Sequence, residues 1–384
     1  MENIDKIKFK DLHFVEEDEG PALAARVMEN RNMLQFLRFF NLSVDMREYV
    51  DRLKQVRTVT ELQYRIMVPV FEQIFEKTTD SLTCDNIEAV PADKAVVYIS
   101  NHRDIILDSG AMNMMLFKKG IRFGNAGIGD NLLMTAPVTL VFNIMKCFVV
   151  KRTLVGKEQV LFLRQLSEFI AYSVRKRGES VWLAQRSGRA KDGNDRTNPA
   201  VLKMIAMAGR KETMAHLESL NIFATAASYE WDPCDVFKVK ELLAHSKGVP
   251  YVKAKNEDML SIHTGICGKK GGLHIGFDPV RTEELQPCVS MSEKEQYTYL
   301  TALMDRKILG CYKLWPTNYI AADLLNGTEP KYARYYTPGQ KAAFLSRMDA
   351  RLQFDEAVLP EARRLFLEGY ANPVFNKVEA GEQG

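Results

Sequence analysis

The sequence lacks most of the patterns that assign a chain to a common class. Its six cysteines are scattered, without a CxxC pair or a Cys/His cluster, which argues against a disulfide framework or zinc site and indicates reduced thiols. No GxGxxG or Walker A motif points to a nucleotide fold, and no GxSxG elbow points to a serine hydrolase. Basic residues are not interleaved with aromatic ones, so we expect no nucleic-acid partner.

Long apolar runs are equally scarce. The first 20 residues hold no apolar signal-peptide core, so we expect a cytoplasmic protein. One membrane candidate exists, residues 132–150, but Pro137, Asn143 and Lys146 interrupt it and it is barely long enough to span. We therefore expect this segment to be buried or to make an interfacial contact.

Charge is distributed unevenly along the 384 residues. The formal net charge is only +3, yet residues 145–196 contain 12 Lys/Arg against 5 Asp/Glu. Such a local excess suits an anionic ligand or an anionic membrane surface, and its simpler alternative is a solvated helix face.

The order of apolar patterns predicts an α/β fold with a largely parallel sheet flanked by helices. Short apolar runs alternate with helical patterns: strands are expected at 95–99, 147–150, 181–184 and 222–229, and helices at 108–120, 157–178 and 199–209. Pro69 is expected to kink or divide a helix. The expected units are a helical N-terminal subdomain (1–88), an α/β domain (89–314) and a helical C-terminal extension (315–384).

Polar patches follow four of these runs, at 101–104, 151–152, 185–193 and 229–235. Parallel strands bring their carboxyl ends to one edge of a sheet, where α/β proteins bind ligands. We therefore expect the four patches to share one cleft.

His102 is the strongest single candidate for chemistry. Histidine takes up a proton near neutral pH, and a carboxylate on its second nitrogen would orient the ring. Asp104 and Asp108 are both close enough in sequence to serve. The alternative is a helix N-cap cluster with a satisfied histidine, in which Asn101 or Asp104 caps the helix.

A second candidate is an anion site of basic residues. Arginine's planar fork matches a phosphate, and glycine lets backbone amides approach it. The residues are Arg152, Arg186, Gly188, Arg189 and Lys191, which could equally be solvated surface. For Tyr229 and Asp232, after the last strand, packing and turn formation compete with substrate contact.

These patches together resemble a known family. SNHRD with a later Asp, FVVKR, QRSGR and SYE stand in the order and approximate spacing of the four motif blocks of the glycerolipid acyltransferases. The resemblance covers Val97 to Asp235, and the wider chain is similar to a longer branch common in Bacteroidetes.

The resemblance implies transfer of a fatty acyl chain from acyl-CoA or acyl-carrier protein to a lysophospholipid or glycerol phosphate hydroxyl. His102 would be the general base, oriented by an aspartate, without an acyl-enzyme. Arg152, Arg186 and Arg189 would hold the phosphate, and the family needs no metal or bound cofactor. The enzyme would work peripherally at the inner face of the cell membrane, through its basic region and an apolar surface such as 132–145.

Three departures from the family pattern stand in this sequence. Five residues instead of four separate His102 from Asp108, which requires a bulge or a late helix start. Ser187 replaces the usual Glu of the third block, and Ala224 lies near the usual proline of the fourth. These changes keep open a lyso-aminolipid acceptor or a catalytically silent lipid-binding homologue.

Overall fold

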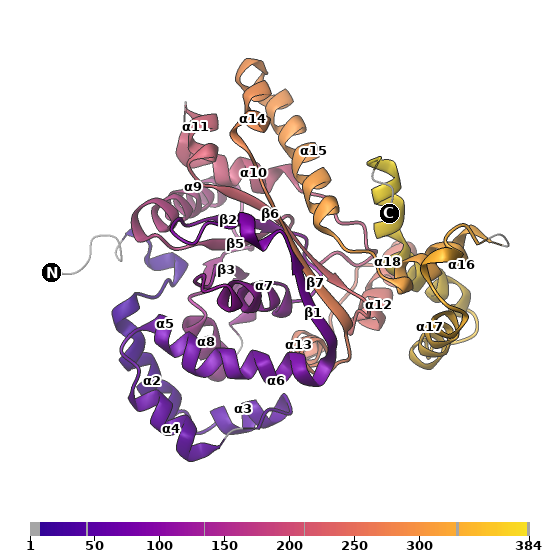
Figure 1. The fold of residues 1–384 in the computed structure, drawn as a ribbon, viewed down its shortest axis with the longest axis horizontal. Helices are drawn as coiled ribbons and strands as arrows, with labels where there is room; N and C mark the ends of the chain where they lie inside the picture. The colour runs from indigo at the N-terminus through magenta and orange to yellow at the C-terminus, as the bar shows by residue number, and fades with distance from the viewer. Residues whose placement is uncertain (1–7, 44, 134, 211, 328–329, 382–384) are drawn as a thin grey trace.

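The computed structural model describes residues 8–43, 45–133, 135–210, 212–327 and 330–381 (Figure 1). Within these ranges the fold is α/β, with one mixed, mostly parallel sheet between helical layers, which confirms the predicted class. Helices also precede and follow the sheet in the chain.

The sheet has the strand order β1-β7-β6-β2-β5-β3-β4. The strands are β1 (Thr79–Asp85), β2 (Val97–Ser100), β3 (Asn125–Gly129), β4 (Phe148–Val150), β5 (Val181–Ala184), β6 (Ile222–Tyr229) and β7 (Gly271–Pro279). Strands β6, β2, β5, β3 and β4 are mutually parallel, whereas β7 runs antiparallel to β6 and pairs in parallel with β1. The carboxyl ends of the five parallel strands therefore share one edge. Four of these strands were expected from the sequence pattern, and β3 was not.

Strands β2 and β6 lie at the centre of the sheet. Val97 is in register with Val181 on one side and with Ile222 on the other. Every residue of β2 and β6 is buried. Burial on both faces explains why these strands are continuous apolar runs without alternation.

One face of the sheet is covered by the N-terminal helices and by two helices between strands, as Figure 1 shows below the sheet. These helices are α2 (Gly20–Glu29), α3 (Met33–Phe39), α4 (Met46–Lys54), α5 (Val59–Leu62), α6 (Val68–Thr78), α7 (Leu107–Lys118) and α8 (Ala136–Ile144). A π-helical turn at Gln63–Met67 separates α5 from α6, and Pro69 stands in the first turn of α6. Pro69 thus divides the helical run, as predicted.

The other face is covered by α9 (Gly156–Tyr172), α10 (Pro199–Ala206), α11 (Thr213–Glu218), α14 (Thr282–Leu285) and α15 (Glu293–Cys311). Helix α12 (Asp235–Ser246) packs with α16 (Pro316–Asn326), α17 (Pro338–Arg351) and α18 (Leu359–Glu379) in a third apolar core. Helix α13 (Glu257–Cys267) lies beside α6. The sheet also takes β1 from residues 1–88, a strand that we did not predict.

The apolar surface expected at 132–145 is absent from the part of this segment that the structure describes, which omits Met134. Val138, Leu140 and Phe142 of α8 are buried in the core beneath the sheet. The segment is apolar because the N-terminal helices cover it, so the prediction of a membrane-facing surface there was wrong. The alternative prediction, a buried segment, was correct.

Gly276 allows α15 to approach β7 closely. An added Cβ at Gly276 would lie 2.4 Å from the backbone oxygen of Cys311. We expect Gly276→Ala to lower the free energy of unfolding by about 1–3 kcal/mol, because the backbones must separate. Urea denaturation measures this. Gly339→Ala is the control, because its Cβ would meet nothing nearer than 3.9 Å, and equal losses in both variants would contradict the packing argument.

Candidate active site

The four polar patches meet at the carboxyl edge of the sheet. The backbone amide of Ala190 donates to the carbonyl oxygen of His102 at 2.9 Å, which joins the first and third patches. Arg152, from the second, lines the same pocket as His102. Tyr229, from the fourth, donates to Asp108 of α7. The expectation of one shared site therefore matches the geometry.

His102 is paired with Asp108. Its Nδ1 lies 2.9 Å from Asp108 Oδ2, and both side chains are buried. Residues 101–106 are not helical, and α7 begins only at Leu107. This late helix start places Asp108 in the first turn, facing back toward His102, and accommodates the extra residue between them.

Asp108 accepts three further hydrogen bonds. The backbone amides of Arg103 and Asp104 donate to Oδ2 at 2.7 and 3.0 Å, and the Tyr229 hydroxyl donates to Oδ1 at 2.9 Å. Burial, followed by the nearby negative charge of Asp108, raises the pKa of Tyr229 well above its usual value, so the phenol stays a donor. Sequence reasoning missed this role of Tyr229. Its position at the end of β6 was the available signal.

The hydrogen bond to Asp108 defines the tautomer of the neutral imidazole. A carboxylate only accepts, so Nδ1 of His102 is the donor, and in the neutral ring Nε2 carries the lone pair. Nε2 has no hydrogen-bond partner among the described residues, and His102 lines an apolar pocket. The ring packs edge-on against Trp182, with centroids 5.8 Å apart. His102 is thus arranged to accept a proton from a bound molecule.

Asp104 holds the turn that leads into α7. Its Oδ1 accepts from the backbone amides of Ile106 and Leu107 at 2.9 and 2.8 Å, although the N-cap residue of the helix is Ile106. Burial and then the charge of Asp108 raise the pKa of Asp104. Gly265 makes room for this carboxylate, because a Cβ there would lie 2.2 Å from Asp104 Oδ2. Of the two carboxylates considered for His102, Asp108 is the one in contact, and Asp104 binds the amides at the start of α7.

The expected anion-binding residues occupy different surroundings. Arg152 lies against Gly129 and lines the pocket with His102. Arg189 Nη1 donates to Ser261 Oγ of α13 at 2.9 Å. Lys191 is ion-paired with Glu241 of α12 at 2.6 Å. Arg152 therefore lies at the pocket, whereas the charge of Lys191 is neutralised by Glu241.

The other two expected anion-binding residues, Arg186 and Gly188, lie on the loop after β5. The half-buried Arg186 side chain makes no hydrogen bond or ion pair within the described ranges. Gly188 has a φ of 76°, and a Cβ there would face open space. Two residues differ from the motifs of the resembled family in type. Ser187 is exposed on this loop, whereas Ala224 is buried inside β6, away from the carboxyl edge of the sheet.

An apolar pocket extends from His102 into the N-terminal helical layer. Its cavity volume is about 130 Å³. Most of its lining is aliphatic or aromatic, from α3, α6, α8 and α13 among others, including Leu37, Phe71, Phe142 and Ile262. His102 and Arg152 are among its few polar lining residues, so a reactive nitrogen and a cation face a space suited to a hydrocarbon chain.

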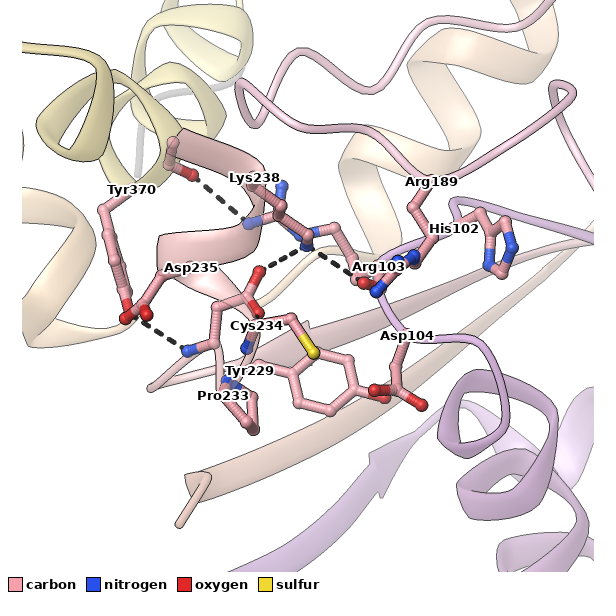
Figure 2. A network of polar contacts seen from close by, with 12 residues as sticks. His102, Arg103, Asp104, Arg189, Tyr229, Pro233, Cys234, Asp235, Lys238 and Tyr370 are labelled. Carbon is pink, nitrogen blue, oxygen red and sulfur yellow. Dashed lines mark hydrogen bonds and ion pairs between the residues drawn. The ribbon is translucent and has the colours of Figure 1, made fainter. Parts of the chain in front are cut away.

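Behind His102, buried charges tie its loop to the C-terminal helices (Figure 2). Lys238 Nζ donates to the carbonyl oxygen of Arg103 at 2.9 Å and is ion-paired with Asp232. The Arg103 guanidinium contacts Asp195 at 3.4 Å and the carbonyl oxygen of Gly369 in α18 at 3.2 Å. Burial alone would raise the pKa of Asp232, but Lys238 and Arg103 outweigh it and lower that pKa. Asp232 therefore stabilises residues 102–104 indirectly, through Lys238, which is hydrogen-bonded to Arg103.

Within the described ranges, no three His, Cys, Asp or Glu side chains are grouped so as to hold a metal ion. None of the helices in the described part of the chain combines the length and apolarity needed to cross a bilayer. No protein-family model and no curated protein sequence matches the chain.

The Tyr229–Asp108 hydrogen bond gives a testable pH dependence. Tyr229→Phe should lower the free energy of unfolding near neutral pH by about 1–2 kcal/mol. The raised pKa of Tyr229 means that the unfolded phenol ionises first above pH 10, so this residue's contribution falls as pH rises. The stability curves of parent and variant should therefore converge above pH 10.0.

Urea denaturation across a pH series measures both effects. Tyr299→Phe is the matched control, because the half-buried Tyr299 hydroxyl has no hydrogen bond within the described ranges. If the free energies of unfolding of Tyr229→Phe and the parent differ by the same amount at every pH, the assignment of the Tyr229–Asp108 hydrogen bond is refuted.

Proposed function

We propose that the protein is a glycerolipid O-acyltransferase. It would move a fatty acyl chain from acyl-CoA or acyl-carrier protein to the hydroxyl of a lysophospholipid or glycerol phosphate. The observation that carries the proposal is the placement of the His102–Asp108 pair in the wall of an apolar pocket. The motif resemblance of residues 97–235 supports the same activity.

The chemistry follows from the free Nε2 of His102. In the proposed step the acceptor hydroxyl gives its proton to Nε2 while its oxygen attacks the thioester carbonyl carbon. Asp108 stabilises the imidazolium that forms, since its carboxylate already accepts from Nδ1. Collapse of the tetrahedral intermediate breaks the C–S bond, and the thiolate leaves with the proton from Nε2. A new ester and a free thiol result, without an acyl-enzyme or an added oxidant or reductant.

The pocket supplies a place for the acyl chain. Moving each methylene group from water to an apolar wall contributes about 0.8 kcal/mol, so the part of the acyl chain that enters this pocket would add to the affinity for the donor. The thioester carbonyl would then lie near His102, where the apolar lining meets Arg152. No resident metal or cofactor has a role in this proposal.

Arg152 is the best-placed cation for the acceptor phosphate. It lines the pocket and has no ion-pair partner among the residues described. Arg189 and Arg186 follow β5 at the same edge and would complete the site, whereas Lys191 already neutralises Glu241. The protein would act peripherally at the inner face of the cell membrane, where its acceptor resides.

Loss of the base should abolish transfer. We expect His102→Ala to lower the rate of acyl transfer by about 10²–10⁴-fold with an unchanged fold, and Asp108→Asn to lower it as well. The assay offers acyl-CoA or acyl-carrier protein with glycerol 3-phosphate, lysophosphatidic acid or a lyso-aminolipid. His245→Ala, on the exposed side of α12, is the matched control. Absence of transfer from every donor to every acceptor would favour a silent lipid-binding protein.

The phosphate assignment has its own test. Arg152→Ala should raise KM for a phosphate-bearing acceptor about tenfold or more, because one charge-assisted contact is lost. An acceptor without phosphate should be used equally well by variant and parent. Arg164→Ala, exposed on α9, serves for comparison. If Arg152→Ala changes KM equally for acceptors with and without phosphate, or if the parent transfers only to the aminolipid, Arg152 does not bind the acceptor phosphate. The role proposed for His102 would be unaffected.

A further inference from the structure

Exposed apolar side chains are concentrated near the candidate site. Many of the large apolar residues with the greatest exposure fall in two segments of the chain, residues 151–161 and 247–260. We call these the two rim segments. Each also carries basic residues, so apolar and cationic surface occur together in both.

The first rim segment follows β4 directly. It begins with Lys151 and Arg152, of which Arg152 lines the pocket. Val155 is 78% exposed, and Leu161, in the second turn of α9, is 58% exposed. Residues 151–161 contain three basic residues and one acidic residue, and Lys151 is ion-paired with Asp11 at 3.2 Å. An exposed valine thus stands between cations, a few residues from the pocket.

The second rim segment joins α12 to α13. Val249 is 54% and Val252 is 85% exposed, and Leu260 in the first turn of α13 is 51% exposed. Residues 247–260 contain three lysines and two acidic residues, and Lys253 is ion-paired with Asp258 at 2.6 Å. The next turn of α13 provides Ser261 to Arg189 and Ile262 to the pocket lining.

Both segments adjoin the pocket that His102 lines. Strand β4 ends at the carboxyl edge of the parallel strands, so the first rim segment begins there, and its Arg152 lines the pocket. The second rim segment ends at Leu260, directly before Ser261, which contacts Arg189, and Ile262, which lines the pocket.

We propose that the two rim segments form the surface with which this protein docks on an anionic lipid bilayer. This inference rests on the proposed function, since it specifies how the site meets a lipid acceptor. Valines at loop positions such as 155 and 252 reach outward instead of lining a groove, which suits insertion among acyl chains. Attraction to anionic headgroups comes from the basic residues of the two segments that have no ion-pair partner among the described residues: Arg152, Lys157, Lys247 and Lys255.

A bilayer fits these features better than an acidic protein partner. An acidic partner such as a carrier protein would use the cations but leave side chains as exposed as Val252 without a role. A lipid surface uses both, because burial of apolar side chains and attraction to anionic headgroups both favour binding. The proposed surface replaces the 132–145 segment, whose apolar residues are in the core.

The test is binding to vesicles, measured by flotation with the full-length protein. We expect the parent to bind vesicles of phosphatidylcholine with phosphatidylglycerol, and to bind pure phosphatidylcholine or high-salt samples more weakly. The double variant Val155→Asp/Val252→Asp should lower the partition coefficient about tenfold or more. Val289→Asp is the matched control: Val289 is 69% exposed but follows α14, at the opposite edge of the sheet.

Several outcomes would overturn the inference: a parent that ignores anionic vesicles, a double variant that binds like the parent, or a Val289→Asp variant that loses as much. Loss of binding to an acidic carrier protein, with vesicle binding intact, would assign the surface to that partner instead. Vesicle binding requires no turnover, so failure of the acyl-transfer assay and failure of docking are separate results. With acceptor in detergent micelles, the double variant should transfer acyl groups at the parental rate.

Discussion

The buried carboxylate of Asp108 is the constraint on which the site depends. An ionised group in the interior is tolerated only when its oxygens are occupied by donors. Here one imidazole, two backbone amides and one phenol supply them, from β6 and from the loop after β2. Satisfying this one charge therefore sets the course of residues 102–106, delays the start of α7 and fixes the histidine tautomer. The free nitrogen in the pocket wall follows from these three effects.

The loop is also held from its other side. The carbonyl oxygens of His102 and Arg103 are engaged by Ala190 and Lys238, so both ends of the peptide beside the imidazole are restrained. Lys238 and Arg103 belong to a buried ionic cluster whose partners reach α18, as Figure 2 illustrates. Removing one partner from such a cluster leaves an uncompensated charge, which costs more than the ion pair itself contributes. The C-terminal helices are in this sense part of the support of the site.

The sequence predicted the parallel centre of the sheet because β2, β5 and β6 are buried apolar runs, and it predicted the His102 patch because that patch follows such a run. It did not predict β1, β3 or β7. TDSLTCD of β1 is an edge strand with many exposed polar residues, and β7 begins with two glycines. Tyr229 was missed as a partner of Asp108 because they are 121 positions apart. Pairings across such distances are not visible in local patterns. The burial of α8 likewise depends on helices from another part of the chain.

The composition of the pocket wall has a consequence for biosynthesis. Phe71 of α6 leaves the ribosome long before Ile262 of α13, yet both belong to the same wall. At about 5–20 residues per second, their synthesis is separated by roughly 10–40 s. During that interval the N-terminal helices present an apolar face that the nascent chain cannot yet cover. The cavity that would hold a lipid tail in the finished protein is thus, earlier, a surface that molecular chaperones would have to shield.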